Sequence, residues 1–244
     1  MIPMSLTRFI ARLTRVRPAR MQGRRPVASI TFDDFPKSAW TVGGALLARH
    51  KLRGTYYTAG SFCGRAVNGT VFYDASDLRA LAAAGHEIAC HGYGHEQTPL
   101  LSNEALADDR RRNAQFLAPF LGGAKLESYA YPYGASSVRT KRFYAPLFTN
   151  LRGVHPGINE GRIDLAQLNA MPVEKRSFSS EMLAAAIARA LNRNGWISFY
   201  THDVSDSPSD YGATPAMLTE VLDRLAEAHI EVLPMREAVA VALG

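Results

Sequence analysis

The sequence predicts a single α/β domain built on a mainly parallel sheet or barrel. The chain has 244 residues, 47% of them apolar, which is enough to bury one sizeable core. Short apolar runs alternate along the chain with segments of helical periodicity. Because each connection between parallel strands needs a helix-sized crossover, this alternation favours a parallel arrangement. No internal repeat, low-complexity segment or linker indicates a second domain.

Seven strands and five helices are expected along the chain. Each strand is a short apolar run, often with β-branched or aromatic side chains, and each helix has apolar residues at three- and four-residue spacing. The strands are expected at residues 27–32, 54–58, 87–90, 128–131, 168–173, 196–201 and 230–233. The helices are expected between them at 39–49, 76–84, 103–117, 180–193 and 215–228.

The net charge of +6 originates in the first 25 residues. Seven of the 28 basic side chains lie in residues 1–25, which contain no acid, so residues 26–244 carry 21 basic and 22 acidic side chains. A basic arm on a nearly neutral domain indicates an anionic surface met by the arm, and argues against a basic groove across the fold. We therefore expect no nucleic-acid partner, and we divide the chain into an arm, 1–25, and a main domain, 26–244.

The arm is expected to contain a short amphipathic helix with Ser5 as its N-cap. Such a helix suits peripheral contact with an anionic membrane face, and it suits equally well packing on the domain with its arginines solvated. The apolar residues at helical spacing are Leu6, Phe9, Ile10, Leu13 and Val16, and the arginines opposite them are Arg8, Arg12 and Arg15.

The sequence contains no apolar stretch of the roughly 18 to 20 residues that cross a bilayer as a helix. A secretory signal is not expected either, because arginines interrupt the apolar residues of the arm throughout. The predicted location is therefore cytoplasmic, with peripheral contact at the inner membrane face as the alternative. Composition and spacing leave the oligomeric state open.

Several enzyme classes lack their characteristic motifs in this chain. There is no Gly-x-Ser-x-Gly elbow and no phosphate-binding GxxxxGK[ST] loop. The two cysteines, Cys63 and Cys90, have neither the number nor the spacing of a disulfide framework or a cysteine metal site. The His-Glu-x-x-His protease motif is also absent around His86, which we interpret as structural.

Four of the expected strands run directly into reactive residue types. The segments are TFDD at 31–34, CHGYGH at 90–95, YPYG at 131–134 and YTHD at 200–203. In parallel barrels the chemistry collects at the carboxyl ends of the strands. We therefore expect these four segments to meet at one end of the domain.

The residue types in these segments indicate metal-assisted chemistry. Neighbouring side chains on an extended chain point in different directions, so of Asp33 and Asp34 one can bind a metal while the other acts as a base. His91 and His95, four residues apart, can form with Asp34 a facial set that leaves metal positions open for water and substrate. His202 ends a buried strand, where a histidine is either a satisfied core group or a proton donor near neutral pH.

From about residue 27 onward the chain resembles the polysaccharide deacetylase family, the NodB-homology domain of carbohydrate esterase family 4. TFDD is similar to the first family motif, which implies that Asp33 is the general base and Asp34 a metal ligand. His91 and His95 match the metal-ligating pair of the second motif. The last motif resembles Tyr200-Thr201-His202, which implies that His202 is the general acid.

Three departures from the family pattern accompany this resemblance. Gly92 stands where a serine or threonine usually follows the first histidine, and Ala130 stands where the third motif has an arginine that orients the base. The rest of the third motif, Pro132-Tyr133-Gly134, is present and implies substrate contacts at Pro132 and Tyr133, with the Tyr133 backbone N–H as oxyanion donor. The fourth motif, an acid followed by an aspartate-tryptophan pair, is not found near residues 164–174.

The resemblance implies a distorted, incomplete (β/α) barrel of about seven parallel strands that binds a divalent metal, with zinc expected and cobalt or nickel as alternatives. It implies hydrolysis of the N-acetyl group of an amino sugar in a polysaccharide, oligosaccharide or lipid-linked glycan. Two other interpretations remain open. One is a related amidohydrolase acting on a formamide, imide or ureide, and the other is a catalytically silent carbohydrate-binding relative, which the missing arginine and fourth motif would favour.

Overall fold

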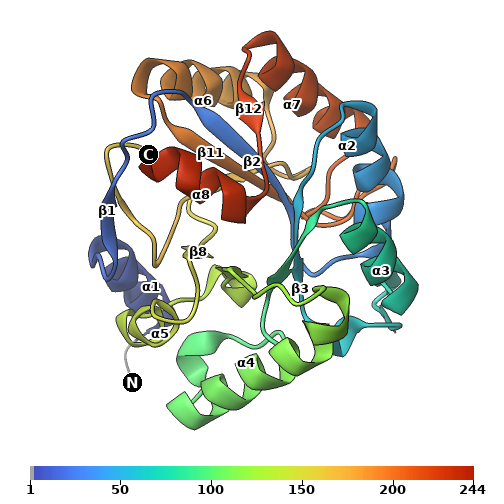
Figure 1. The fold of residues 1–244 in the computed structure, drawn as a ribbon, viewed down its shortest axis with the longest axis vertical. Coiled ribbons are helices and arrows are strands. Elements are labelled where there is room, and N and C mark those ends of the chain that lie inside the picture. Colours follow the sequence, from blue (N-terminus) through green and yellow to red (C-terminus); the bar gives the residue numbers. More distant parts are fainter. Residues whose placement is uncertain (1–2) are drawn as a thin grey trace.

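The computed structural model describes residues 3–244 and has the predicted architecture, a curled, incomplete barrel of parallel strands with helices packed outside it (Figure 1). Seven strands lie in the order β10-β11-β2-β3-β6-β7-β8, and β12 pairs with the first residues of β2. All of these pairings are parallel. Their bounds are β2 Val27–Phe32, β3 Thr55–Thr58, β6 Glu87–Cys90, β7 Ser128–Ala130, β8 Asn150–Arg152, β10 Met171–Pro172, β11 Trp196–Thr201 and β12 Glu231–Val232.

The remaining strands form two small antiparallel pairs outside this sheet. They are β1 Pro18–Arg20 with β9 Arg162–Asp164, and β4 Ala66–Val67 with β5 Thr70–Val71. The helices are α1 Met4–Leu13, α2 Ala45–Arg49, α3 Ala75–Ala83, α4 Asn103–Leu117, α5 Val138–Tyr144, α6 Ser180–Arg193, α7 Pro215–Glu227 and α8 Met235–Leu243.

The predicted elements are confirmed where the sequence pattern is long or strongly apolar. Strands β2, β6 and β11 and helices α4 and α6 have the predicted bounds. The predicted helix 39–49 begins as a π-helical turn, Ala39–Gly44, and only its second half is α-helical. The predicted strand 168–173 shortens to β10. Strand β8 and helices α5 and α8 were not predicted.

Strand β2 alternates between two environments, and this alternation positions the site. Ala28, Ile30 and Phe32 belong to the core between the sheet and the outer helices. Ser29 and Thr31 point into the curl, where Ser29 accepts a hydrogen bond from the Trp196 indole at 3.0 Å and Thr31 donates to the Phe199 carbonyl at 2.8 Å. With a side-chain period of two, the next inward position is residue 33, at the carboxyl end of the strand.

Helix α8 closes the amino-terminal end of the curled sheet. Its apolar residues Met235, Ala238 and Val239 pack into the curl. The Met235 and Arg236 backbone N–H groups, which have no partner within the helix, donate to the Thr55 hydroxyl at 2.9 Å and the Glu87 carboxylate at 3.0 Å. The four reactive segments of the sequence lie at the opposite, carboxyl-terminal end, where β2, β6, β7 and β11 end.

The arm forms the predicted amphipathic helix and then joins the domain as a strand. Helix α1 begins after Pro3, and Ser5 lies inside it, so the prediction of Ser5 as N-cap is wrong. The turn is instead supported by Thr7, whose hydroxyl donates to the Pro3 carbonyl at 3.2 Å. Residues 1 and 2 of the predicted arm lie outside the described residues. Within residues 3–244, no helix has the length and apolar character that crossing a bilayer requires.

His86 is a structural histidine, as predicted. Its Nδ1 accepts a hydrogen bond from the Gly54 N–H at 2.9 Å, and its ring packs edge-on against Trp40 and Tyr56. Burial, with a smaller contribution from Arg53, lowers the pKa of His86 from 6.5 to about 4. The folded protein therefore holds this ring neutral at pH values where the unfolded chain protonates it.

We expect the free energy of unfolding to fall as the pH falls from about 6.5 to about 4, because the unfolded state binds the proton first. In His86→Asn, which keeps a hydrogen-bond acceptor but not the titration, the loss between pH 7 and pH 5 should be smaller by up to about 2 kcal/mol. Urea unfolding at both pH values measures this difference. Equal losses in the two proteins would contradict the assignment.

Candidate metal centre and active site

Three side chains from two strand ends converge on one point and form a candidate metal centre. Asp34 Oδ1 lies 3.2 Å from His91 Nε2 and 2.9 Å from His95 Nε2. One ligand atom from each of the three residues lies within 4.8 Å of the other two. Asp34 Oδ1 is buried, and among the described residues only these two ring nitrogens lie within hydrogen-bonding distance of it. Two imidazoles and one carboxylate that converge in this way fit a divalent metal such as zinc.

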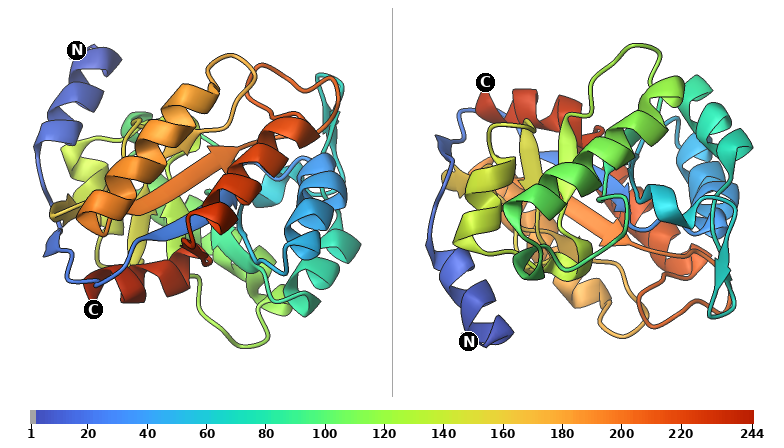
Figure 2. Two further views of the ribbon diagram at one scale, coloured as in Figure 1. Left: turned by 90° about the horizontal axis from the view of Figure 1, so that it is seen from above. Right: turned by 90° about the horizontal axis from the view of Figure 1, so that it is seen from below.

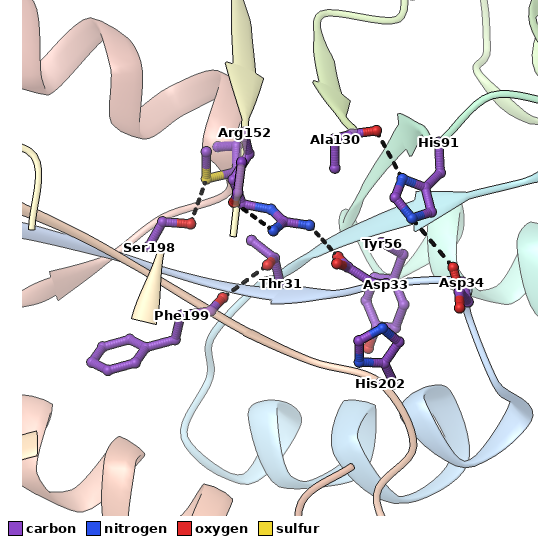
Figure 3. A network of polar contacts seen from close by, with 12 residues as sticks. Thr31, Asp33, Asp34, Tyr56, His91, Ala130, Arg152, Ser198, Phe199 and His202 are labelled. Atoms are coloured by element: carbon purple, nitrogen blue, oxygen red, sulfur yellow. Dashed lines mark hydrogen bonds and ion pairs between the residues drawn. The ribbon is translucent and has the colours of Figure 1, made fainter. Parts of the chain in front are cut away.

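The His91 ring is held in the tautomer that binds metal. Its Nδ1–H donates to the Ala130 carbonyl at 2.8 Å, which leaves the lone pair on Nε2 facing Asp34 (Figure 3). Burial raises the pKa of Asp34, but hydrogen bonds and charge from His91 and His95, when these rings carry a proton on Nε2, lower it by more, so it lies well below its usual value. The carboxylate is therefore ionised at neutral pH, which is the form that binds a metal.

A tight turn at the end of β2 aims the two aspartates in different directions. The Phe35 N–H donates to the Asp33 carbonyl at 2.6 Å across Asp34, whose φ is 61°. The Phe35 ring anchors the turn by stacking on Tyr73 at a centroid distance of 4.7 Å. Such three-residue turns with positive φ are rare and strained, and they persist where packing enforces them.

Two further site residues share this rare backbone conformation. His95 has φ 54° and Tyr133 has φ 57°, and their rings lie 4.5 Å apart between centroids. Positive φ is found in only a few per cent of non-glycine residues, and each instance costs roughly 1–3 kcal/mol. Its concentration at Asp34, His95 and Tyr133 indicates that the fold is strained at this site.

The loop between the two histidines is held by Asp109 of α4. Its carboxylate accepts hydrogen bonds from the backbone N–H groups of Tyr93 at 3.0 Å and Gly94 at 2.7 Å. Gly92 has φ 71°, and a Cβ there would lie 2.7 Å from the Asp109 carboxylate. The missing serine or threonine hydroxyl is therefore replaced by a carboxylate from a neighbouring helix, and glycine leaves the space for it.

Asp33 is paired with Arg152, a residue that the sequence analysis did not identify. The two side chains are hydrogen-bonded and almost completely buried, and Figure 3 shows the Arg152 guanidinium pointing at the Asp33 carboxylate. The guanidinium carbon lies 4.8 Å from the centre of the Tyr57 ring and 5.1 Å from that of Tyr200. Burial lowers the pKa of Arg152, but Asp33 and the neighbouring groups raise it by more, so the arginine stays charged.

Arg152 lies on the strand next to Ala130, the position at which the family has its arginine. In the parallel ladder between β7 and β8, Ala130 and Arg152 are direct register partners. Side chains at paired positions of adjacent strands point to the same face of a sheet. The guanidinium therefore approaches Asp33 from one strand further along the barrel. The only sequence signal was an arginine in a three-residue strand that was not predicted.

His202 lies at the carboxyl end of β11, half-buried, with its orientation fixed by a loop. Its Nδ1–H donates to the Tyr211 carbonyl at 3.1 Å, so this hydrogen bond uses Nδ1 and not Nε2. Arg176 stacks on the Tyr211 ring at 4.1 Å and pairs with the buried Glu174 at 2.7 Å. These contacts hold the loop that orients His202, and they lie where the fourth family motif was not found.

The Pro132-Tyr133-Gly134 turn lies beside the metal centre. Pro132 is buried, whereas 57% of Tyr133 is exposed. Gly134 has φ 61°, and a Cβ there would lie 2.1 Å from Val154, so only glycine closes this turn. The predicted site residues thus lie at the carboxyl-terminal ends of the strands, with Tyr133 next to His95.

The fold and the motifs agree with known proteins. The family model described as polysaccharide deacetylase matches residues 20–147, a region that ends before Arg152 and His202. No curated protein matches the chain.

Solved structures resemble the chain at low sequence identity and therefore support the fold alone. A family 4 acetyl xylan esterase from Clostridium thermocellum in complex with a cobalt ion is 18% identical, with a TM-score of 0.62, covering 88% of this chain and 91% of its own. A family 4 carbohydrate esterase from Streptomyces lividans in complex with acetate is 18% identical, with a TM-score of 0.55 and coverages of 87% and 92%. A CE4 family pseudoenzyme from Bacillus anthracis is 13% identical, with a TM-score of 0.58 and coverages of 91% and 68%.

More than half of the chain matches the family model, and the matched segment carries the Asp-Asp pair, the two histidines and the Pro-Tyr-Gly turn. The chain belongs to the polysaccharide deacetylase family.

Proposed function

We propose that the protein is a metal-dependent deacetylase that hydrolyses the N-acetyl group of an amino sugar in a polysaccharide, oligosaccharide or lipid-linked glycan. The observation that carries this proposal is the pairing of Asp33 with Arg152 beside the Asp34-His91-His95 cluster. A base, a ligand set for a metal and a histidine able to donate a proton are the groups that amide hydrolysis requires. All of them come from strand ends of one barrel.

Each residue of the site has its own role in the proposed hydrolysis. A divalent metal at Asp34, His91 and His95 would acidify water and polarise the substrate carbonyl. Asp33 takes a proton from the attacking water, and Arg152 holds the Asp33 carboxylate in place.

Tyr133 and His202 carry out the remaining steps. The Tyr133 N–H donates to the oxygen that becomes negative when water adds to the carbonyl. His202 Nε2 gives a proton to the departing nitrogen as the C–N bond breaks. The products are acetate and the free amine of the sugar.

The three departures from the family pattern weigh little in favour of a silent protein. The guanidinium missing at Ala130 has a counterpart in Arg152, and the hydroxyl missing at Gly92 has one in Asp109. His202 also has a fixed orientation through the Tyr211 carbonyl. The chain therefore offers a counterpart for each of these groups. The guanidinium comes from β8 and the carboxylate from α4, and neither comes from the family's own motif position.

Exposed aromatic rings support a carbohydrate substrate. Tyr133 packs against His95, and Tyr211 lies beside His202 with a centroid distance of 5.8 Å; 57% and 51% of these two residues are exposed. Aromatic faces of this kind suit the apolar C–H faces of sugar rings, while the hydroxyl at the ring edge remains available for hydrogen bonding.

The function is tested by acetate release from N-acetylated oligosaccharides by the purified protein, before chelation, after chelation and after restoration of zinc, cobalt or nickel. We expect activity that is lost with the metal and returns with it. Acetylated xylan and a formamide analogue are assayed in parallel, because ester cleavage or formate release would identify a different acyl substrate. A fully metal-loaded protein that releases no acid from any of them would contradict the proposal.

Asp33→Asn and His202→Ala should each lower the rate of acetate release by roughly 10² to 10⁴-fold, the usual effect of losing a general base or acid. Both variants should keep the metal content of the wild-type protein, because neither residue belongs to the ligand cluster. Metal analysis and acetate assays measure the two properties. The matched controls Asp223→Asn and His50→Ala, at a remote pair on the helical face, should retain the rate. Unchanged rates in the first pair would overturn the assignment of roles.

Arg152→Ala should lower kcat by about 10²-fold or more while leaving the metal content unchanged, because it frees the Asp33 carboxylate from the position in which it accepts a proton. Arg152→Lys should recover little of this rate, since one ammonium group does not reproduce the planar guanidinium between two tyrosine rings. Stability is followed by thermal unfolding, because a buried carboxylate without its partner is destabilising by about 3–5 kcal/mol. A folded Arg152→Ala protein with the wild-type kcat would exclude the positioning role.

A further inference from the structure

Helix α1 presents a continuous apolar stripe to the solvent. Leu6, Phe9, Ile10 and Leu13 recur at three- and four-residue spacing, and 46%, 54%, 41% and 66% of these residues are exposed. This spacing places all four on one side of a helix. An exposed contiguous apolar surface on a helix indicates contact with something outside the domain.

The opposite side of α1 is already packed against the domain, so the stripe cannot fold back onto it. Ala11 is completely buried, and α1 lies beside α5 (Figure 1). Lys141 of α5 is buried and donates to the Ala11 and Thr14 carbonyls at 2.7 Å each. Figure 2 shows α1 at the edge of the molecule in both views.

The segment after α1 is fixed to the domain as well. Lys141 pairs with Asp164 at 2.7 Å, and the Asp164 carboxylate accepts hydrogen bonds from the Val16 and Arg17 N–H groups. Strand β1 then pairs with β9. These contacts hold the arm on the domain with the apolar stripe facing outward. The stripe therefore does not need to fold on binding.

The charged side chains of the arm are all of one sign. Residues 1–25 contain seven arginines and no acid. Arg12, Arg15 and Arg20 are exposed, and within residues 3–244 none of the three has a carboxylate within ion-pair distance. An apolar helix face on an arm with exposed, unpaired arginines complements a surface that is apolar inside and negatively charged at its boundary.

We propose that α1 docks the protein on membranes that contain anionic lipids, with its apolar stripe in the boundary between headgroups and acyl chains and its arginines at the lipid phosphates. A second copy of the chain fits the stripe less well, because two such helices would bring their arginines together without any acid of the arm to pair them. The proposal does not depend on the catalytic residues and can be tested separately from them.

The test is co-sedimentation of the full chain with vesicles of phosphatidylcholine, with and without phosphatidylglycerol. We expect binding to the anionic vesicles that weakens as salt is added. Phe9→Ser with Leu13→Ser should lower the affinity for anionic vesicles by at least about tenfold, because two apolar side chains that would be buried in the bilayer are lost. Arg12→Gln with Arg15→Gln should weaken binding to anionic vesicles and leave the weak binding to neutral ones unchanged.

Point substitutions are preferred to deletion of the arm, because deletion would remove the partners of Lys141 and Asp164. The matched control replaces two exposed apolar residues of α6, Met182→Ser with Leu191→Ser, and should bind as the wild-type protein does. All variants should act on a soluble substrate at the wild-type rate. The proposal is overturned if the wild-type protein does not bind anionic vesicles or if the stripe variant binds them equally well. It is overturned as well if ultracentrifugation shows a dimer that only the stripe variant loses.

Discussion

The buried ion pair between Arg152 and Asp33 is the interaction on which the rest of the site depends. A guanidinium removed from water is costly unless a carboxylate and further favourable contacts compensate it, and here Asp33, Tyr57 and Tyr200 provide them. The pair sits inside the curl at the carboxyl end of β2 and β8. Because Asp33 and Asp34 are adjacent, whatever fixes the first also limits where the second can present its oxygen to His91 and His95.

The site illustrates that chemistry requires groups at points in space and not at particular positions of a chain. The carboxyl ends of the strands of a parallel barrel lie in one region, so a guanidinium on β8 can reach Asp33 from the register partner of the β7 position. The Asp109 carboxylate stands in for a hydroxyl of the histidine loop in the same way. A loop carbonyl at Tyr211, held through Arg176 and Glu174, orients His202 where the fourth motif is absent.

The parts of the molecule that could be predicted are those in which a clear apolar strand pattern is followed directly by residue types that bind metals or transfer protons. β2, β6 and β11 are apolar runs followed by acidic or histidine residues, so these strands and the candidate site residues at their ends could be predicted from them. β8 was missed because three residues, one of them a charged Arg152, carry no periodicity. The pairing with Asp33 depends on register between strands that are distant in sequence, which no local pattern contains. The helix of the arm was predicted. The side on which it packs against the domain was not, because it depends on the hydrogen bonds from Lys141 to the carbonyls of Ala11 and Thr14.

The positioning role of Arg152 is tested most directly by moving the guanidinium from β8 to the neighbouring strand β7. Ala130→Arg is combined with Arg152→Ala, and kcat for acetate release is compared with that of Arg152→Ala alone, at equal metal content. The double variant should recover at least about tenfold in kcat, because both positions face the same side of the sheet. A folded, metal-loaded double variant that stays as slow as Arg152→Ala would contradict the claim that Arg152 acts by holding Asp33.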